Sequence, residues 1–270
     1  MKLSIITINW NNAEGLARTL DSVKAQTCKE FEHVIVDGAS TDGSVEIIQS
    51  YVRDVSSMMC DVLWVSEKDT GIYNAMNKGI RMAKGEYLLF LNSGDVLVDG
   101  DVVKKFNEVE VNADIATGIE RLPSGELIYP KKDSELSYSY FYEDTLLHQS
   151  TFIRKDAFER YGMYREDYRI VSDWEWFFRV LVRDGASYQP LDFVVADFDG
   201  TGMSCNAKCR QLHDEEREKV HQTFLPRVRR DYDELMRLRE IETEYRHLKS
   251  GKMGWLVRLM LKCKKGLKKK

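Results

Sequence analysis

The sequence has little cysteine and proline and no long apolar run, and each shortage excludes a class of protein. Five cysteines in 270 residues are too few, and odd in number, for a disulfide framework, so we expect a reducing cytoplasm. No run approaches the ~18 apolar residues that a membrane-spanning helix needs, and no cleavage site follows the apolar N-terminal segment. The composition therefore predicts a cytoplasmic globular protein with one large domain or two small ones.

Charge is unevenly spread along the chain, and acidic residues are lacking at its end. The formal net charge is −4, although residues 252–270 hold eight basic residues and no acid. This segment contributes +8 and leaves −12 on the other residues. Such an acidic body argues against nucleic acid as the main partner.

The basic segment also carries an apolar stripe. Trp255, Leu259, Cys263 and Leu267 fall on one side of a helix, and basic residues cover much of the rest. This pattern is typical of an interfacial helix on an anionic membrane surface, where each basic residue contributes about 1 kcal/mol. We therefore expect peripheral attachment to the inner face of the cell membrane. The alternative is a solvated, frayed tail.

Apolar runs alternate with helical patterns over the first hundred residues. The predicted strands are Leu3–Ile8, His33–Val36, Val62–Val65 and Tyr87–Leu91. The pattern predicts one helix capped by Asn11, a second around Ile48, and a third after Thr70. Strands that alternate with helices indicate a parallel sheet with right-handed crossovers, so we predict an α/β fold.

After Asp95 the pattern changes to shorter elements. We expect strands at Asp114–Ile119, Glu126–Tyr129, Gln149–Ile153 and Phe193–Phe198. We expect helices at Asp101–Glu108, Lys155–Tyr161 and Asp173–Arg183, and from Asn206 to about Lys249.

A first group of polar residues follows the first two strands. It consists of Thr7, Asn9, Asp37, Ser40 and Asp42. In an open α/β sheet, ligands bind beyond the carboxyl ends of the strands, so this group could bind a base and a ribose. The alternative is turn chemistry, because Asp and Ser favour such turns whatever they bind.

A second group follows the third strand and includes Asp69 and Gly71. An acid, a base and a glycine beyond the end of a strand favour a ligand-binding role for this group. The alternative is structural, because Thr70 is a plausible helix cap. Lys78, two helical turns further on, could face a phosphate or merely solvent.

A third group, Asn92, Ser93 and Asp95, follows the fourth strand. A hard divalent cation such as Mn²⁺ or Mg²⁺ prefers carboxylate oxygen and keeps phosphates and waters as its other ligands. We therefore assign Asp95 as the metal ligand. A polar turn before the next helix is the alternative.

These motifs, with His148-Gln149 and Ser172-Asp173-Trp174-Glu175, occur in the order and spacing of a known family. Over about residues 1–205 the chain resembles family 2 glycosyltransferases with the GT-A fold. The resemblance implies a Rossmann-like, mostly parallel sheet sandwiched by helices, with a C-terminal helical extension. The family's metal motif often reads Asp-x-Asp, whereas here Asn92 and Asp95 are separated by Ser93-Gly94.

The resemblance also implies an inverting enzyme that uses a nucleotide-diphosphate sugar, usually a UDP-sugar. It places the general base at Asp173, with Glu175 as the rival, and a carboxylate there could take a proton from the acceptor hydroxyl. Ser172-x-x-Glu175 is also a capping box, and both interpretations can hold together.

On the acceptor side the resemblance implies His148 and Gln149, with Trp174 and Glu175 nearby. A histidine near a strand is more often structural, and tryptophans more often pack in a core. The acceptor would be a glycan or a lipid-linked glycan in cell-surface polysaccharide synthesis.

We divide the chain into a nucleotide-sugar-binding half at 1–98 and an acceptor-binding, catalytic half of the same domain at 99–205. A helical extension at 206–251 and a basic amphipathic tail at 252–270 follow. The other interpretations are an inactive nucleotide- or glycan-binding relative and a sugar-phosphate nucleotidyltransferase. A dehydrogenase is disfavoured because no Gly-x-Gly-x-x-Gly follows Leu3–Ile8.

Overall fold

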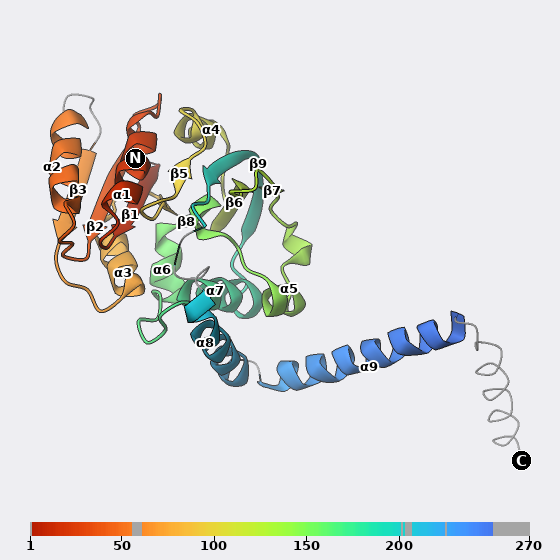
Figure 1. Ribbon diagram of the computed structural model, residues 1–270. Coiled ribbons are helices and arrows are strands. Elements are labelled where there is room, and N and C mark those ends of the chain that lie inside the picture. Colours follow the sequence, from red (N-terminus) through yellow and green to blue (C-terminus); the bar gives the residue numbers. More distant parts are fainter. Residues whose placement is uncertain (1, 56–60, 201, 203–206, 225, 251–270) are drawn as a thin grey trace, which may run out of the picture. The chain divides into compact units, whose positions relative to one another are not determined.

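The computed structural model describes residues 2–55, 61–200, 202, 207–224 and 226–250 (Figure 1). The chain divides into two units, Met1–Arg217 and Glu218–Lys270. The predicted basic tail at 252–270 lies outside the described residues. Among those that are described, no helix is both long and apolar enough to cross a bilayer.

The first half of unit 1 is the parallel sheet that the sequence predicts. Its strands are β1 (Leu3–Asn9), β2 (Phe31–Asp37), β3 (Asp61–Ser66) and β4 (Tyr87–Phe90). They pair in the order β3-β2-β1-β4, and every pairing is parallel. β1, β2 and β4 are buried throughout, which explains why they read as continuous apolar runs.

Helices cover both faces of this sheet. They are α1 (Ala13–Lys24), α2 (Ser44–Val55) and α3 (Ile72–Met82), as Figure 1 shows. Ile35 of β2 packs in one apolar cluster with Leu16 of α1 and Ile48 of α2. Gly79 of α3 lies against Ile6 of β1, so α3 covers the opposite face.

Two predicted helix caps are wrong by one residue. The cap of α1 is Asn12, whose side-chain oxygen accepts the Gly15 N–H at 3.1 Å. Asn11 instead has a left-handed backbone (φ 47°), and its side chain accepts the Thr41 N–H at 2.8 Å. The cap of α3 is Gly71 rather than Thr70.

Beyond β4 the sheet becomes mixed. Its further strands are β5 (Val96–Leu97), β6 (Ile115–Arg121), β7 (Leu127–Ile128), β8 (Thr151–Arg154) and β9 (Tyr188–Asp197). β8 runs antiparallel to β4 and to β6, whereas β6 and β9 are parallel. The parallel pattern expected from the resemblance therefore holds for the first half, and antiparallel pairs dominate the second.

The boundaries of the second-half strands differ from the prediction. Gln149 does not open β8, because residues His148–Ser150 form a short 3₁₀ turn, η3. β9 begins at Tyr188, five residues before the predicted start at Phe193. Pairing with β6 recruits Gln189 and Pro190, which carry no strand signal of their own.

The helices of the second half are short. They are α4 (Val102–Glu108), α5 (Tyr138–Glu143), α6 (Lys155–Tyr161) and α7 (Ser172–Phe178), which continues as a π-helical segment, Arg179–Arg183. The predicted capping box at Ser172 does not form. Val171 occupies the cap position of α7, and Ser172 already belongs to the helix.

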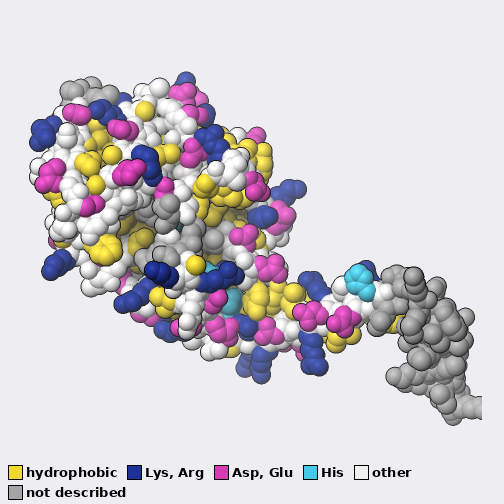
Figure 2. Space-filling view, in the orientation of Figure 1, with side chains coloured by type: hydrophobic (Ala, Val, Ile, Leu, Met, Phe, Trp, Pro, Cys, Tyr) yellow, Lys and Arg dark blue, Asp and Glu magenta, His cyan; other side chains and the backbone are white. Residues whose placement is uncertain are grey.

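Two helices end the described chain, as predicted: α8 (Arg210–Thr223) and α9 (Pro226–Ser250). The boundary between the two units falls within α8. Arg229 pairs with Glu218 and Asp233 inside the second unit. Along α9, exposed apolar side chains such as Leu238 lie among charged ones (Figure 2).

Candidate active site

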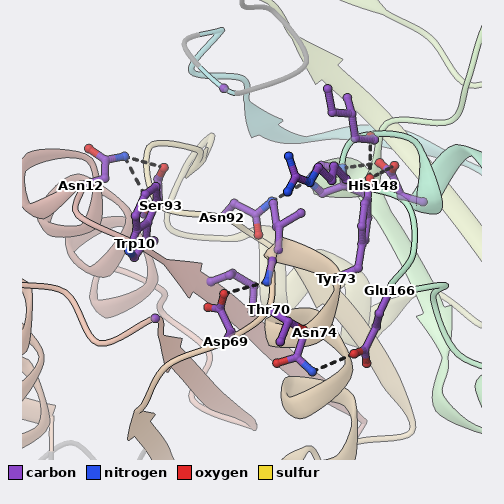
Figure 3. Close-up of a pocket in the computed structure, with 18 of the residues that line it drawn as sticks. Trp10, Asn12, Asp69, Thr70, Tyr73, Asn74, Asn92, Ser93, His148 and Glu166 are labelled. Carbon is purple, nitrogen blue, oxygen red and sulfur yellow. Dashed lines mark hydrogen bonds and ion pairs between the residues drawn. The ribbon is translucent and has the colours of Figure 1, made fainter. Parts of the chain in front are cut away.

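A cavity of about 860 Å³ lies in unit 1, beyond the carboxyl ends of β1 and β4 and beside the starts of α3 and α7 (Figure 3). Seven of the predicted site residues line it: Asp69, Gly71, Asn92, Ser93, Asp95, His148 and Asp173. The fold therefore brings together side chains from positions 69 to 173 at the edge of the sheet where ligands of α/β proteins bind.

On one wall, Trp10 and Asp69 flank the backbone of Gly38. Trp10 directly follows β1, and its side chain is 70% exposed. A Cβ atom on Gly38 would lie 2.7 Å from Asp69 Oδ2 and 3.0 Å from Trp10 Cδ1, so a larger residue here would displace the Asp69 carboxylate. Asp69 Oδ1 also accepts the Gly71 N–H at 2.9 Å. The wall thus presents an indole ring and a carboxylate side by side.

The loop after β4 is fixed by α1. The Asn12 side chain, which caps α1, also donates to the Ser93 carbonyl at 2.9 Å (Figure 3). Thr19, about two turns further along the same helix, donates to the Asp95 carbonyl at 2.7 Å. Because the backbone of this loop is held at two points, Asn92, Ser93 and Asp95 keep fixed positions on the cavity wall.

Asp95 and Asp199 form the most acidic part of the cavity. Asp95 is only 6% exposed, and one of its carboxylate oxygens accepts the Asp199 N–H at 2.9 Å. A Cβ atom on Gly94 would lie 3.0 Å from the Asp199 carboxylate, so the two acids are neighbours. Burial raises the pKa of the Asp95 carboxyl, and the charge of Asp199 adds to that effect, while the hydrogen bond and His148 oppose it.

This pair suits a divalent cation. Oxygen ligands match Mg²⁺ or Mn²⁺, and a cation would offset both the burial and the mutual repulsion of Asp95 and Asp199. The described residues contain no group of three or more Asp, Glu, His or Cys side chains placed to hold a metal. Substrate phosphates and water are the usual source of the remaining ligands of such a cation.

Asp173 lies in the first turn of α7 with both carboxylate oxygens occupied. The Tyr73 hydroxyl lies 2.7 Å from Oδ1 and 2.6 Å from the Ile170 carbonyl, and His148 Nδ1 lies 3.2 Å from Oδ2. Burial would raise the pKa of the Asp173 carboxyl, but the hydrogen bonds from His148 and Tyr73 and the charge of His148 outweigh it and lower that pKa. The carboxylate is therefore ionised at neutral pH, the form that a general base requires.

Glu166 forms another part of the wall together with α3. Its carboxylate accepts a hydrogen bond from the side chain of Asn74 at 2.8 Å (Figure 3). It also accepts one from the side chain of Asn77 at 2.8 Å. These bonds lower the pKa of Glu166 and hold the segment before α7 against α3.

Three residues of the first predicted group lie outside the cavity lining because of the alternation of β1 and β2. Thr7, Asn9 and Asp37 share the strand face that carries Ile35, which packs on α1 and α2, whereas Ile8 on the opposite face lines the cavity. Thr7 is hydrogen-bonded to His33 at 2.9 Å inside the sheet.

Asp37 is the centre of a closed network. It accepts hydrogen bonds from Asn9, Ser40 and Ser66. Burial opposes its ionisation, but these bonds outweigh burial and lower its pKa. Asp42 likewise accepts from Ala13 N–H at 2.8 Å and from Ser44, at the starts of α1 and α2. Ser40 and Asp42 also lie outside the cavity lining, so a direct role for them in donor binding stays a prediction.

The remaining predicted residues also lie outside the lining. Lys78 pairs with Glu67 at 2.8 Å. Gln149 is buried and donates to Glu120 at 2.8 Å. The Trp174 indole donates to the Phe141 carbonyl at 2.8 Å, and Glu175 pairs with Arg179 at 2.9 Å. All four side chains are committed to contacts within the fold.

Several lining residues have no counterpart in the sequence prediction, among them Trp10, Tyr73, Asn74, Glu166 and Asp199. The sequence could have indicated Trp10 as a site residue, because it immediately follows a buried strand. The helical pattern of α3 gave Tyr73 no distinction from an ordinary core residue. Glu166 and Asp199 lie in loops without any periodicity.

Comparison with known proteins agrees with this arrangement. The model of the family "Glycosyl transferase family 2" matches residues 4–169. The chain belongs to glycosyltransferase family 2. It is 30% identical over 213 residues to a PGL/p-HBAD biosynthesis glycosyltransferase of Mycobacterium bovis, covering 75% of this chain and 78% of that one. It is 31% identical over 209 residues to an uncharacterized glycosyltransferase of Mycobacterium tuberculosis, covering 74% and 76%.

Solved structures show the same fold. S. aureus TarS 1-349 in complex with UDP-GlcNAc matches with a TM-score of 0.59 and 18% identity over 83% of this chain and 73% of that one. A mannosyltransferase from Pyrobaculum calidifontis in complex with GDP-Man and Mn²⁺ matches with a TM-score of 0.57 and 16% identity, over 73% and 56%. This family 2 chain is therefore a sugar-transferring enzyme with the GT-A fold.

Proposed function

We propose that this family 2 enzyme is an inverting glycosyltransferase that moves a sugar from a nucleotide-diphosphate sugar, a UDP-sugar, to an acceptor hydroxyl. The observation that carries the proposal is that Asp95 and Asp173 line one cavity. One carboxylate is suited to the cation of a diphosphate, and the other to the proton of an incoming alcohol. The TarS complexes with UDP and UDP-GlcNAc support the choice of donor.

In this proposal the donor enters along the wall formed by Trp10 and Asp69. The exposed indole offers a flat face to the nucleotide base, and Asp69 offers a carboxylate to ribose hydroxyls. Asp95, with Asp199 beside it, holds a divalent cation. When bound, that cation neutralises charge on the diphosphate as it leaves.

The chemical step follows from the position of Asp173. Its carboxylate takes the proton from the acceptor hydroxyl as the oxygen attacks the anomeric carbon. A new carbon–oxygen bond forms while the bond from that carbon to the diphosphate breaks, and the configuration inverts. Asp173 is favoured over Glu175 because Asp173 lines the cavity, whereas Glu175 is paired with Arg179.

The acceptor in this proposal is a glycan or a lipid-linked glycan in cell-surface polysaccharide synthesis. Support comes from the relative whose name places it in PGL/p-HBAD biosynthesis. The predicted amphipathic tail at 252–270, with its eight basic residues, would keep the enzyme at an anionic membrane surface on the cytoplasmic side.

A panel of sugar nucleotides tests the proposal. The purified protein is incubated with UDP-glucose, UDP-galactose, UDP-GlcNAc and GDP-mannose in the presence of Mn²⁺, and release of the nucleoside diphosphate is measured. We expect release from one UDP-sugar, and we expect EDTA to abolish it. No release and no calorimetric binding of any of the four compounds would indicate an inactive relative and contradict the proposal.

A further inference from the structure

Asp173 is held from two elements that are distant in the sequence. Tyr73, in the first turn of α3, lies 2.7 Å from Oδ1 of Asp173. His148, in the 3₁₀ turn η3, lies 3.2 Å from Oδ2. Neither contact belongs to the regular hydrogen bonding of α7, so each has to be supplied by the tertiary fold. Together they fix the orientation of both carboxylate oxygens.

The groups around Asp173 are well shielded from solvent. Tyr73 is 5% exposed, and the side chains of His148 and Asp173 are about four-fifths buried. A hydrogen bond to a charged group in such surroundings is stronger than one in water, and losing it leaves the charge uncompensated.

The second ring nitrogen of His148 reaches the loop after β4. Nε2 lies 3.0 Å from the side-chain amide of Asn92 (Figure 3). The turn that carries His148 is anchored to β6, since Gln149 and Ser150 both donate to the buried carboxyl of Glu120. Both nitrogens of His148 thus contact protein groups, which leaves neither free as a primary ligand for an acceptor.

Charged groups face His148 from three sides, and they determine its protonation. Burial alone would lower the pKa of the imidazole, but Asp173, with Asp95 and Glu120, raises it. Because an ionised carboxylate can only accept, His148 donates its Nδ1–H to Asp173 and stabilises the ionised form of the carboxyl. The hydroxyl of Tyr73 also stabilises the ionised form of Asp173. Burial and the charge of Asp173 hold the pKa of Tyr73 well above its usual value, so the hydroxyl keeps its proton.

We propose that Tyr73 and His148 are positioning residues: they clamp the Asp173 carboxylate in its ionised form and in one orientation toward the acceptor. This inference rests on the proposed role of Asp173 as the general base. Asn92 ties the clamp to the loop that carries Asp95. The donor side and the base are thereby parts of one hydrogen-bonded assembly that spans β4, η3, α7 and α3.

The chain offers a matched pair of variants. Tyr73→Phe removes the hydroxyl that contacts Asp173. Tyr164→Phe removes a hydroxyl from a neighbouring ring, whose centre lies 5.8 Å from that of Tyr73. Tyr164 is equally buried, and its hydroxyl has no hydrogen-bond partner within the described part of the chain. Both changes delete a hydroxyl oxygen from one aromatic cluster. Only Tyr73→Phe removes a contact with Asp173, and it also removes the 2.6 Å contact with the Ile170 carbonyl.

The test is the pH dependence of kcat/KM with the sugar nucleotide that the panel identifies, for both variants and for His148→Gln. Loss of a hydrogen bond to a carboxylate raises its pKa, so the acidic limb should move to higher pH by about one unit in Tyr73→Phe and in His148→Gln. We expect kcat at neutral pH to fall at least about tenfold with the donor Kd unchanged, because the base stays ionised but is misoriented. Tyr164→Phe should keep the wild-type profile.

Two results would overturn the inference. One is a wild-type acidic limb in Tyr73→Phe, and the other is an equal shift in Tyr164→Phe. The Asp173→Asn variant separates this failure from failure of the proposed function. If Asp173→Asn is inactive while Tyr73→Phe is normal, the base stands and the clamp does not. If Asp173→Asn is fully active, the assignment of the base is itself wrong.

Discussion

The two halves of unit 1 build their parts of the cavity in different ways. In the β1–β4 half, parallel strands end at one edge, and the cavity residues follow those ends in regular succession. In the β5–β9 half, antiparallel pairs predominate, and the cavity residues come from a 3₁₀ turn, loops and the first turn of α7. In the proposed function, the first half is a platform for the donor and the second half supplies the general base.

Two fully buried carboxyls show the same contrast at atomic scale. Asp37, in the first half, accepts hydrogen bonds from Asn9, Ser40 and Ser66, which lower its pKa despite burial. Glu120, in the second half, accepts only from Gln149 and Ser150, and burial raises its pKa to about 7. Of these two groups, Asp37 in the first half is stabilised in its charged form, whereas Glu120 in the second half is costly to ionise.

The largest effect is expected from removing the proposed base of the second half. Asp173→Asn keeps the shape and the contact with Tyr73 but cannot take a proton. We expect kcat to fall by about 10²–10⁴-fold. The donor Kd, measured by calorimetry, should stay within about twofold of the wild-type value. A normal kcat would contradict the division of roles between the two halves.

The buried carboxyls predict opposite dependences of stability on pH. Glu120 has a folded pKa of about 7, above its unfolded value. Its protonated form therefore contributes fully to the stability of the fold below about pH 4.5, and this contribution is lost as pH rises through 7. Glu120→Gln should therefore raise the free energy of unfolding at pH 8 by about 3 kcal/mol, as measured by urea denaturation.

Asp37 provides the comparison for that experiment. Its pKa is lowered on folding, so its contribution is present above the unfolded pKa and is lost as pH falls toward the folded one. Asp37→Asn should destabilise the protein at pH 8, opposite in sign to Glu120→Gln. Destabilisation by both variants at pH 8 would remove the contrast between the two halves.

A smaller effect is expected at the platform. Trp10→Ala removes the exposed indole beside Asp69 and should weaken donor binding about tenfold, since stacking of a base on an aromatic ring contributes about 1–3 kcal/mol. Tyr129→Ala is the control, because Tyr129 is 61% exposed and lies outside the cavity lining. Equal donor affinity in both variants, by calorimetry, would exclude Trp10 from the donor site.

The sequence was sufficient to predict where the strands of the first half end, because buried parallel strands are continuous apolar runs. After β3 and β4 it also predicted which residues line the cavity, but after β1 it did not. Asn9 is the last residue of β1, and Trp10 directly follows it, yet only Trp10 lines the cavity. Asn9 and Asp37 lie on the strand face that packs on α1 and α2, so the alternation of the strands decides which side chains line the cavity.

In the second half, His148 and Asp173 were identified through the family resemblance rather than through any period in the sequence. Their partners were not predicted, since Tyr73 lies 100 positions away from Asp173 and reads as an ordinary helix residue. Gln149, Trp174 and Glu175 share the motifs of the site but are committed to Glu120, Phe141 and Arg179. The contacts of Tyr73, Gln149 and Trp174 join residues that are far apart in the sequence, and local patterns do not encode such contacts.

A crystal structure of the protein with the preferred UDP-sugar and Mn²⁺ tests the central claim most directly. The account predicts the nucleotide in the cavity, with its base against Trp10, its diphosphate and the Mn²⁺ at Asp95, and the anomeric carbon open to attack from the side of Asp173. A nucleotide bound elsewhere on the molecule, or a diphosphate remote from Asp95, would contradict it.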